Sequence, residues 1–180
     1  MNLTVKKYLI ENKQLSVSVV SKSEMYSSHI PVSAMIPLLL SQEERITLHF
    51  KNNQGSVLVI DALSSGSVTY EKRITDVLGT VKLFGTKSKL KNFGASYHTI
   101  MQMNHFDLID NLTSYYKESE QQELSMIEND DAVVMVRALP SYDAVFYERV
   151  IQKFQAGGNI LREYDDCFVG NEYIDVFEKE

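Results

Sequence analysis

The clearest hydrophobic pattern lies in the stretch 46–70, which predicts three strands joined by two tight turns. From Ile46 to Phe50 every second residue is apolar, the two-residue period of a strand with one buried face. The polar segment 52–55 ends in glycine and suits a hairpin turn, and the apolar run 57–60 predicts a strand covered on both faces. A second turn is expected at 64–67. Because such a meander cannot bury its apolar face alone, the rest of the chain must pack on it.

Further strands are expected on both sides of this meander. Alternating or continuous apolar residues predict them at 3–9, 15–19, 81–84, 93–100 and 132–139. The segment 85–92 is expected to be a loop, with lysines in it and beside it at positions 82, 87, 89 and 91. These lysines could contact an anion. We favour the simpler interpretation, in which a solvated lysine-rich edge discourages association between sheets.

Two amphipathic helices are predicted in the second half of the chain. The first spans 104–120, with Asn104 as the N-cap and Asp107 adding negative charge to the first turn. The second follows Ser141, which can cap it, and Gly157 is placed to stop it. Apolar residues recur at three- and four-residue spacing in both, so each is expected to bury one stripe.

A shorter helix is expected to start near Pro31 and to end or kink at Pro37. The pattern as a whole predicts an α+β fold, with antiparallel β-meander sheets packed with helices and a C-terminal helical or extended arm. We expect a core domain over 1–154 and an arm over 155–180, because the last stretch mixes apolar residues with many acids and lacks a core of its own.

Composition narrows the possible partners. The 180 residues carry a net charge of −6, which argues against nucleic acid or an anionic membrane surface as the main partner. No apolar run is long enough to span a bilayer and no signal peptide opens the chain, so we expect a cytoplasmic protein. The one cysteine, Cys167, rules out an internal disulfide framework and a metal site made of thiolates alone.

Candidate catalytic chemistry is sparse. The sequence has neither a glycine-rich phosphate loop nor a GxSxG nucleophile motif. His98 and His105 with Asp107 could begin a metal or catalytic site, but zinc sites need three or four clustered ligands, so we expect no metal and no cofactor. Asp61 could act as a base at the end of a buried strand, although capping of the following turn is the simpler role. We therefore expect a protein that is not an enzyme.

Four short segments resemble a known family in their order and approximate spacing. They are RITL at 45–48, VLVIDA at 57–62 after a glycine turn, the tyrosine-rich segment ending in ESEQ at 112–121, and VRALP at 136–140. Together they resemble the amino-terminal domain of the 33-kDa heat-shock chaperone family. The members of this family are redox-regulated bacterial holdases. The resemblance covers 46–154.

The chain also departs from that family. The family carries a C-terminal zinc module with paired cysteines, whereas this chain ends at Glu180 with a lone cysteine. The glycine pair expected before the VRALP strand reads Asp130 and Asp131. The resemblance therefore implies the substrate-binding domain and part of the linker arm, without zinc and without the disulfide switch. Since Asp165 and Asp166 disfavour a thiolate at Cys167, we expect peroxide to leave the fold and client binding unchanged.

The resemblance implies an ATP-independent chaperone that binds unfolded or partly folded proteins through apolar surface in the stress response. We expect the client-binding side chains in the second helix and the arm. They are Val145, Phe146, Phe154, Ile160, Leu161 and Phe168. The alternative for each of these is that it packs on the meander.

Two other functions stay open at this point. The same scaffold could serve as a non-catalytic protein–protein adaptor. An adaptor would bind one native partner, whereas a holdase binds many unfolded proteins. An enzyme acting through His98, His105 and Asp107 is the third hypothesis, and it requires those side chains to converge on one pocket. The arm could also mediate a homodimer.

Overall fold

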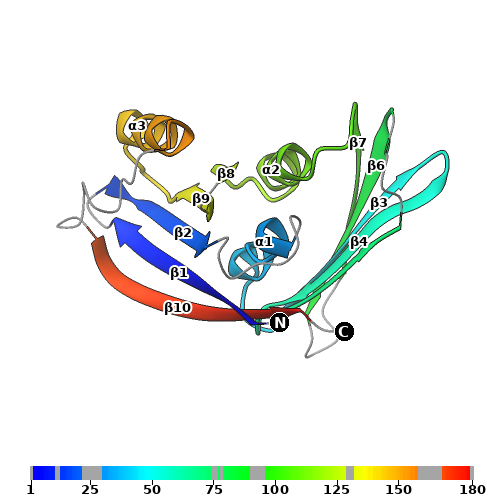
Figure 1. The fold of residues 1–180 in the computed structure, drawn as a ribbon, viewed down its shortest axis with the longest axis horizontal. Coiled ribbons are helices and arrows are strands. Elements are labelled where there is room, and N and C mark those ends of the chain that lie inside the picture. Colours follow the sequence, from blue (N-terminus) through cyan, green and yellow to red (C-terminus); the bar gives the residue numbers. More distant parts are fainter. Residues whose placement is uncertain are drawn as a thin grey trace. The chain divides into compact units, whose positions relative to one another are not determined.

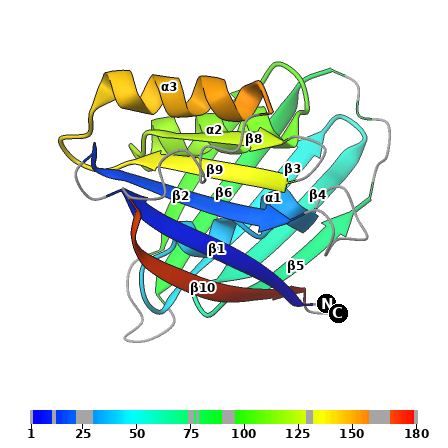
Figure 2. The ribbon, with the colours of Figure 1, turned by 60° about the vertical axis from the view of Figure 1, so that its left-hand side comes forward.

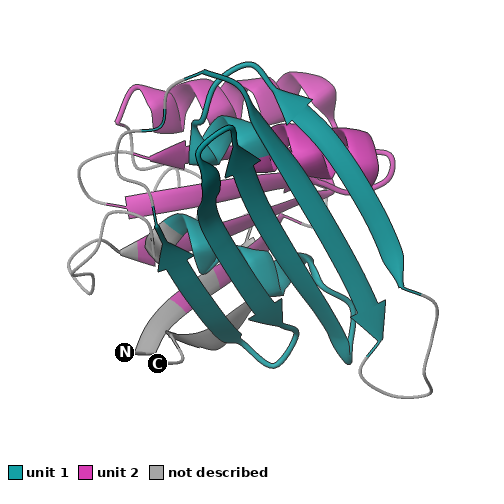
Figure 3. Cartoon of the chain, turned by 90° about the vertical axis from the view of Figure 1, so that its right-hand side faces the viewer, with its two compact units in different colours: residues 1–2, 32–111, 176–180 teal, residues 3–31, 112–175 magenta. Residues whose placement is uncertain are grey.

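The computed structural model describes residues 2–10, 13–21, 30–73, 77, 79–89, 96–128, 132–157 and 168–178. The chain forms two compact units (Figure 3). Unit 1 comprises 1–2, 32–111 and 176–180, and unit 2 comprises 3–31 and 112–175. Both are built from an antiparallel sheet and helical segments, so the predicted α+β class is confirmed (Figure 1).

The sheet of unit 1 contains the predicted meander. Its strands lie in the order β7-β6-β3-β4-β5 and neighbours run antiparallel. Their bounds are β3 Glu44–Asn52, β4 Gly55–Leu63, β5 Ser67–Lys72, β6 Val81–Lys89 and β7 Tyr97–Met103. Ile46, Leu48 and Phe50 are fully buried, as their alternation predicts. Gly55 closes the β3–β4 turn at a φ of 117°, a backbone conformation that side chains disfavour.

The predicted loop at 85–92 is wrong over most of its length. Strand β6 continues to Lys89, because it pairs with β3 along its whole length. Lys89 Nζ and Lys87 Nζ lie 3.6 and 4.0 Å from Glu44 Oε2, across that pair of strands. The buried Glu44 carboxylate also accepts a hydrogen bond from Ser41 N at 2.6 Å. Two of the lysines therefore neutralise a buried acid.

Short helical segments precede the meander. Helix α1 spans Ile30–Ser33 and the 3₁₀ helix η3 spans Ile36–Leu39. Together they occupy the region where the sequence predicts one helix that starts near Pro31 and ends or kinks at Pro37. Pro37 lies in the first turn of η3, where a missing amide costs no hydrogen bond. Ile36, Pro37 and Leu39 are buried, and η3 contacts β4 within unit 1.

The sheet of unit 2 joins the start of the chain to its second half. Strands lie in the order β1-β2-β9-β8 and neighbours run antiparallel. The bounds are β1 Asn2–Ile10, β2 Leu15–Ser21, β8 Leu124–Glu128 and β9 Ala132–Ala138. Strand β8 has no counterpart among the predicted strands. Its five residues are too few for a periodic signal, and it is stabilised by pairing with β9.

Helix α3, Ala144–Gln155, packs on β8 and β9 (Figure 2). Its buried face is Phe146, Tyr147, Val150, Ile151 and Phe154, which form one apolar cluster with residues of the sheet. Asp143 is the N-cap, with its side chain accepting a hydrogen bond from Phe146 N at 3.0 Å. The prediction of Ser141 as cap is wrong by two residues. The helix ends before Gly157, which has the predicted left-handed φ of 81°.

Helix α2, Leu108–Ser119, begins later than the sequence predicts. Asp107 Oδ1 accepts a hydrogen bond from Asp110 N at 3.0 Å, which makes Asp107, rather than Asn104, the residue that caps the helix. The helix crosses the boundary between the units after Asn111. Tyr115 and Tyr116, from the predicted stripe, are buried in unit 2.

The predicted C-terminal arm includes an extended segment. Residues Phe168–Glu178 form strand β10, whose end pairs in parallel with β5 through Phe177 and Glu178. Residues 158–167 of the predicted arm lie outside the described residues, and the division into 1–154 and 155–180 stays a prediction. Among the described residues, no helix has both the length and the apolar character needed to cross a bilayer.

Replacing Ser18 with alanine is expected to stabilise unit 2 by about 1 kcal/mol. Ser18 is fully buried and its Oγ makes no hydrogen bond with the part of the chain that the structure describes, so the hydroxyl loses hydration without compensation. Urea unfolding measures the change. Ser125→Ala is the matched control, because Ser125 Oγ bonds Tyr147 Oη at 3.0 Å and its removal should destabilise the protein. Stabilisation by both substitutions, or by neither, would contradict this account.

Candidate functional site

The open face of the unit 1 sheet carries two neighbouring apolar side chains at its β7 end, Ile100 and Phe84, which we call the apolar row. The register aligns Ile100 with Phe84, and Phe84 with His49 on the next strand. These positions alternate with the buried ones, so their side chains lie on the face away from the core. Figure 3 looks onto this sheet, and none of the described helical segments of unit 1 lies in front of it. Ile100 is 67% exposed, which leaves a large aliphatic side chain in water.

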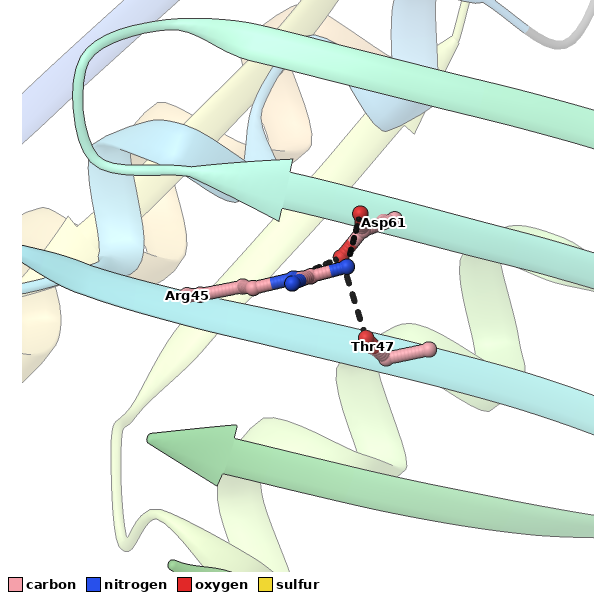
Figure 4. Close-up of polar contacts among 3 residues, drawn as sticks. All are labelled: Arg45, Thr47 and Asp61. Carbon is pink, nitrogen blue, oxygen red and sulfur yellow. Dashed lines mark hydrogen bonds and ion pairs between the residues drawn. The ribbon is translucent and has the colours of Figure 1, made fainter. Parts of the chain in front are cut away.

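Polar groups beside this row are paired with one another. Arg45 donates two hydrogen bonds to the Asp61 carboxylate, at 2.8 and 2.7 Å, and Thr47 Oγ1 donates a third at 3.0 Å (Figure 4). The hydrogen bonds and charge of Asp61 raise the pKa of the Arg45 guanidinium. Asp61 therefore bridges β3 and β4. Asp61 does not cap the following turn, so that prediction is wrong. Its carboxylate is already hydrogen-bonded and is not the free group that a general base requires.

His49 is held in a similar way. Its Nε2 forms a short hydrogen bond with Ser56 Oγ. Burial, together with the charges of Lys51 and Arg73, lowers the pKa of His49, which favours the neutral imidazole at pH 7. Lys51 Nζ lies 5.4 Å from the centre of the Phe84 ring, within the range of a cation–π contact. The ring is thus flanked by a cation on one strand and by the exposed Ile100 on the other.

The residues of the possible metal or catalytic site have separate partners. His98 Nδ1 lies 3.4 Å from Thr86 Oγ1, and His105 Nε2 lies 3.8 Å from the Asp110 carboxylate. Asp107 caps α2. Among the described residues, no group of three or more His, Cys, Asp or Glu side chains is arranged to hold a metal ion. Each of these side chains has a local structural role.

The predicted client-binding residues fall into three groups. Val145 is 71% exposed, as a binding residue must be. Phe146 and Phe154 are 6% and 4% exposed and pack against the unit 2 sheet, and not against the meander as the alternative proposed. Ile160 and Leu161 lie outside the described residues, and for Phe168 the structure describes only the backbone, within β10.

Sequence analysis missed the most exposed apolar side chains of unit 1. Tyr97 and Ile100, both in β7, are 69% and 67% exposed. A signal for Ile100 was present, because it alternates with Met101 and Met103, which point to the covered face. The alternation of apolar residues does not show that β7 lies at the end of the strand order. At that position fewer neighbouring strands cover its side chains.

Comparison with known proteins identifies the fold. No family model and no curated protein matches the chain. A similar solved structure is the crystal structure of the 33 kDa chaperonin, a heat shock protein 33 homologue, from Thermotoga maritima. It matches with a TM-score of 0.64 and 13% sequence identity, covering 99% of this chain and 80% of that chain. The chain therefore has a fold like that of the chaperonin, and the expectation of this fold from four short segments is confirmed.

Proposed function

We propose that the chain is an ATP-independent holdase, which binds unfolding proteins through apolar surface. The observation that carries the proposal is the likeness to the 33 kDa chaperonin over 99% of the chain. The scaffold is that of a chaperone, and its described residues provide exposed apolar side chains of the kind that an unfolded segment would cover.

The apolar row of β7 and β6 is the best-supported client-binding surface. Ile100 and Phe84 lie side by side on the open face, and the polar groups next to them are already paired within the sheet. Apolar segments could cover the row without breaking those pairs. As β7 ends the strand order of unit 1, an extended client segment could also lie along it.

We propose that these 180 residues bind clients without a zinc-and-disulfide switch of their own. One cysteine in 180 residues cannot form a disulfide within the chain. Client binding is therefore constitutive, or regulated by association of the arms of two chains. Peroxide treatment should leave the activity unchanged.

Replacing Ile100 with serine is expected to reduce the suppression of client aggregation several-fold, because it removes the most exposed aliphatic side chain of the row. Light scattering of a heat-unfolding client, measured with and without peroxide, gives the activity. Gln102→Ser is the matched control, since Gln102 is exposed two residues along the same face of β7.

Three outcomes would count against the proposal. The holdase function fails if the unaltered protein leaves aggregation unchanged at several-fold molar excess. The assignment of the surface fails if Ile100→Ser and Gln102→Ser behave alike. Recovery of one native partner, with no binding of unfolded clients, would instead indicate an adaptor.

A further inference from the structure

A pocket of about 360 Å³ opens in unit 2, between the connection from α2 to β8 and the turn from β9 to α3. It is lined by residues 121–123 and 137–142. No residue of the apolar row or of the Arg45 network contributes to this lining. The pocket is therefore separate from the proposed client-binding surface.

Arg137 brings a cation into this pocket, and no side chain in the described part of the chain forms an ion pair with it. It lies near the end of β9, between Ser16 on β2 and Leu124 on β8. Its side chain is half-buried, and burial lowers the pKa of the guanidinium. No carboxylate among the described residues forms an ion pair with it. Glu123 lines the same pocket, but its carboxylate lies 3.4 Å from Lys117 Nζ. A partly desolvated guanidinium favours an anion that reaches it.

The rest of the wall combines an unsatisfied acceptor with apolar surface. Gln122 Oε1 is buried and accepts no hydrogen bond from the part of the chain that the structure describes. Leu139, Pro140 and Tyr142 supply carbon surface, and Tyr142 is 36% exposed. The neighbouring backbone is already engaged, since Ala138 N donates to Glu123 O at 2.8 Å. The side chains of the wall are therefore the groups that we assign to a ligand.

The backbone on both sides of the pocket is held in a costly conformation. Gln121 and Ser141 have φ values of 51° and 65°, in the left-handed region that residues other than glycine, asparagine and aspartate seldom adopt. Ser141 lies in a turn closed by the hydrogen bond from Tyr142 N to Leu139 O at 3.1 Å. Tertiary structure therefore imposes the shape of this pocket, as it does at many binding sites.

We propose that the pocket binds the C-terminal residue of a peptide. The terminal carboxylate pairs with the Arg137 guanidinium, whose fork of donors matches two carboxylate oxygens. The apolar side chain rests on Leu139, Pro140 and Tyr142. Rotation of the Gln122 side chain turns its buried, unsatisfied oxygen to accept a hydrogen bond from the peptide N–H. A carboxylate suits the pocket better than a phosphate because Glu123 lines it too, and repulsion grows with the charge of the ligand. This site is independent of the proposed holdase surface.

Three small probes test the proposal on the full chain. N-acetyl-leucine has the carboxylate, the N–H and the side chain; N-acetyl-leucinamide lacks the charge; 4-methylpentanoate lacks the N–H. We expect N-acetyl-leucine to bind with saturation, shifting the backbone NMR signals of 121–123 and 137–142. The amide and 4-methylpentanoate should each bind about tenfold more weakly, as expected for losing a charged or a buried hydrogen bond.

Charge-matched variants show whether Arg137 is responsible. Arg137→Gln should abolish saturable binding, whereas Arg149→Gln, which removes the same charge from an exposed position on α3, should leave it unchanged. Arg137→Lys keeps the charge and loses the fork, so it should bind with intermediate affinity. Glu123→Gln should tighten binding, because it removes a like charge from the pocket wall.

The proposal is overturned by any of three results. The first is the absence of saturable binding of N-acetyl-leucine to the folded protein. The second is an equal loss of binding in Arg137→Gln and Arg149→Gln, which would indicate attraction by net charge alone. The third is equal affinity for 4-methylpentanoate and N-acetyl-leucine, which would assign the pocket to simple apolar acids. If Arg137→Gln unfolds, the comparison of Arg137→Lys with the unaltered protein decides.

Discussion

Replacing Phe146 with alanine is expected to cost about 3 to 5 kcal/mol of the free energy of unfolding, whereas the same change at its neighbour Val145 should cost less than about 0.5 kcal/mol. Phe146 is 6% exposed and packs with Val150 and Phe154 of α3 against the unit 2 sheet, and Lys13 Nζ lies 5.3 Å from its ring centre. Removing the ring leaves a cavity that the surrounding strands can fill only in part. Val145 is 71% exposed and leaves none.

Urea unfolding followed by far-ultraviolet circular dichroism measures both changes. This pair of variants separates the two interpretations of α3 that the sequence leaves open. Replacing a client-binding residue with alanine should lower the stability little, whereas replacing a core residue should lower it much more. Similar costs at the two positions would contradict the burial described for α3.

Raising the pH from 10 to above 12 is expected to remove about 2 to 3 kcal/mol of stability through Tyr147 alone. Tyr147 is 3% exposed, and burial raises the pKa of its hydroxyl to about 12, although the hydrogen bond with Ser125 opposes the shift. The folded protein thus retains this proton to a higher pH than the unfolded chain, whose tyrosines ionise near pH 10. The contribution is fully present below pH 10 and is lost as the pH rises to about 12.

Replacing Tyr147 with phenylalanine isolates this effect. Tyr147→Phe should lose less stability than the unaltered protein between pH 9 and pH 12, because its ring cannot ionise. Absorbance of tyrosinate near 295 nm follows the ionisation directly. Burial raises the pKa of Tyr70 to about 12 as well, so part of the alkaline loss should remain in Tyr147→Phe. An unchanged pH dependence in Tyr147→Phe would refute the assignment.

Local patterns predicted most of the elements. The alternation from Ile46 to Phe50 marked both the strand and its buried face, because each side chain of a strand points to the face opposite its neighbours. Helix α3 was visible for a similar reason, but its apolar pattern did not separate the exposed Val145 from the buried Phe146. The lysine-rich end of β6 looked like a loop, since nothing nearby in the sequence shows that its lysines meet Glu44.

Helix caps show where such local reasoning fails. Ser141 and Asn104 are good capping residues by type, but Ser141 is held in a turn by the bond from Tyr142 N to Leu139 O. Asp143 caps α3 instead, and its carboxylate is also 3.3 Å from Lys13 Nζ, 130 positions earlier in the chain. No window of sequence includes both partners of that ion pair.

By itself the sequence determined the period of each long element, the α+β class and the paucity of catalytic chemistry, because these depend on neighbouring residues and on composition. Only the tertiary structure decided which side chains stay exposed and which charges stay unpaired. Ile100 is exposed because β7 ends its sheet's strand order, and Arg137 lines a pocket in which no described carboxylate forms an ion pair with it. Both outcomes depend on pairing between segments far apart in the chain, whose hydrogen bonds and packing no local pattern records.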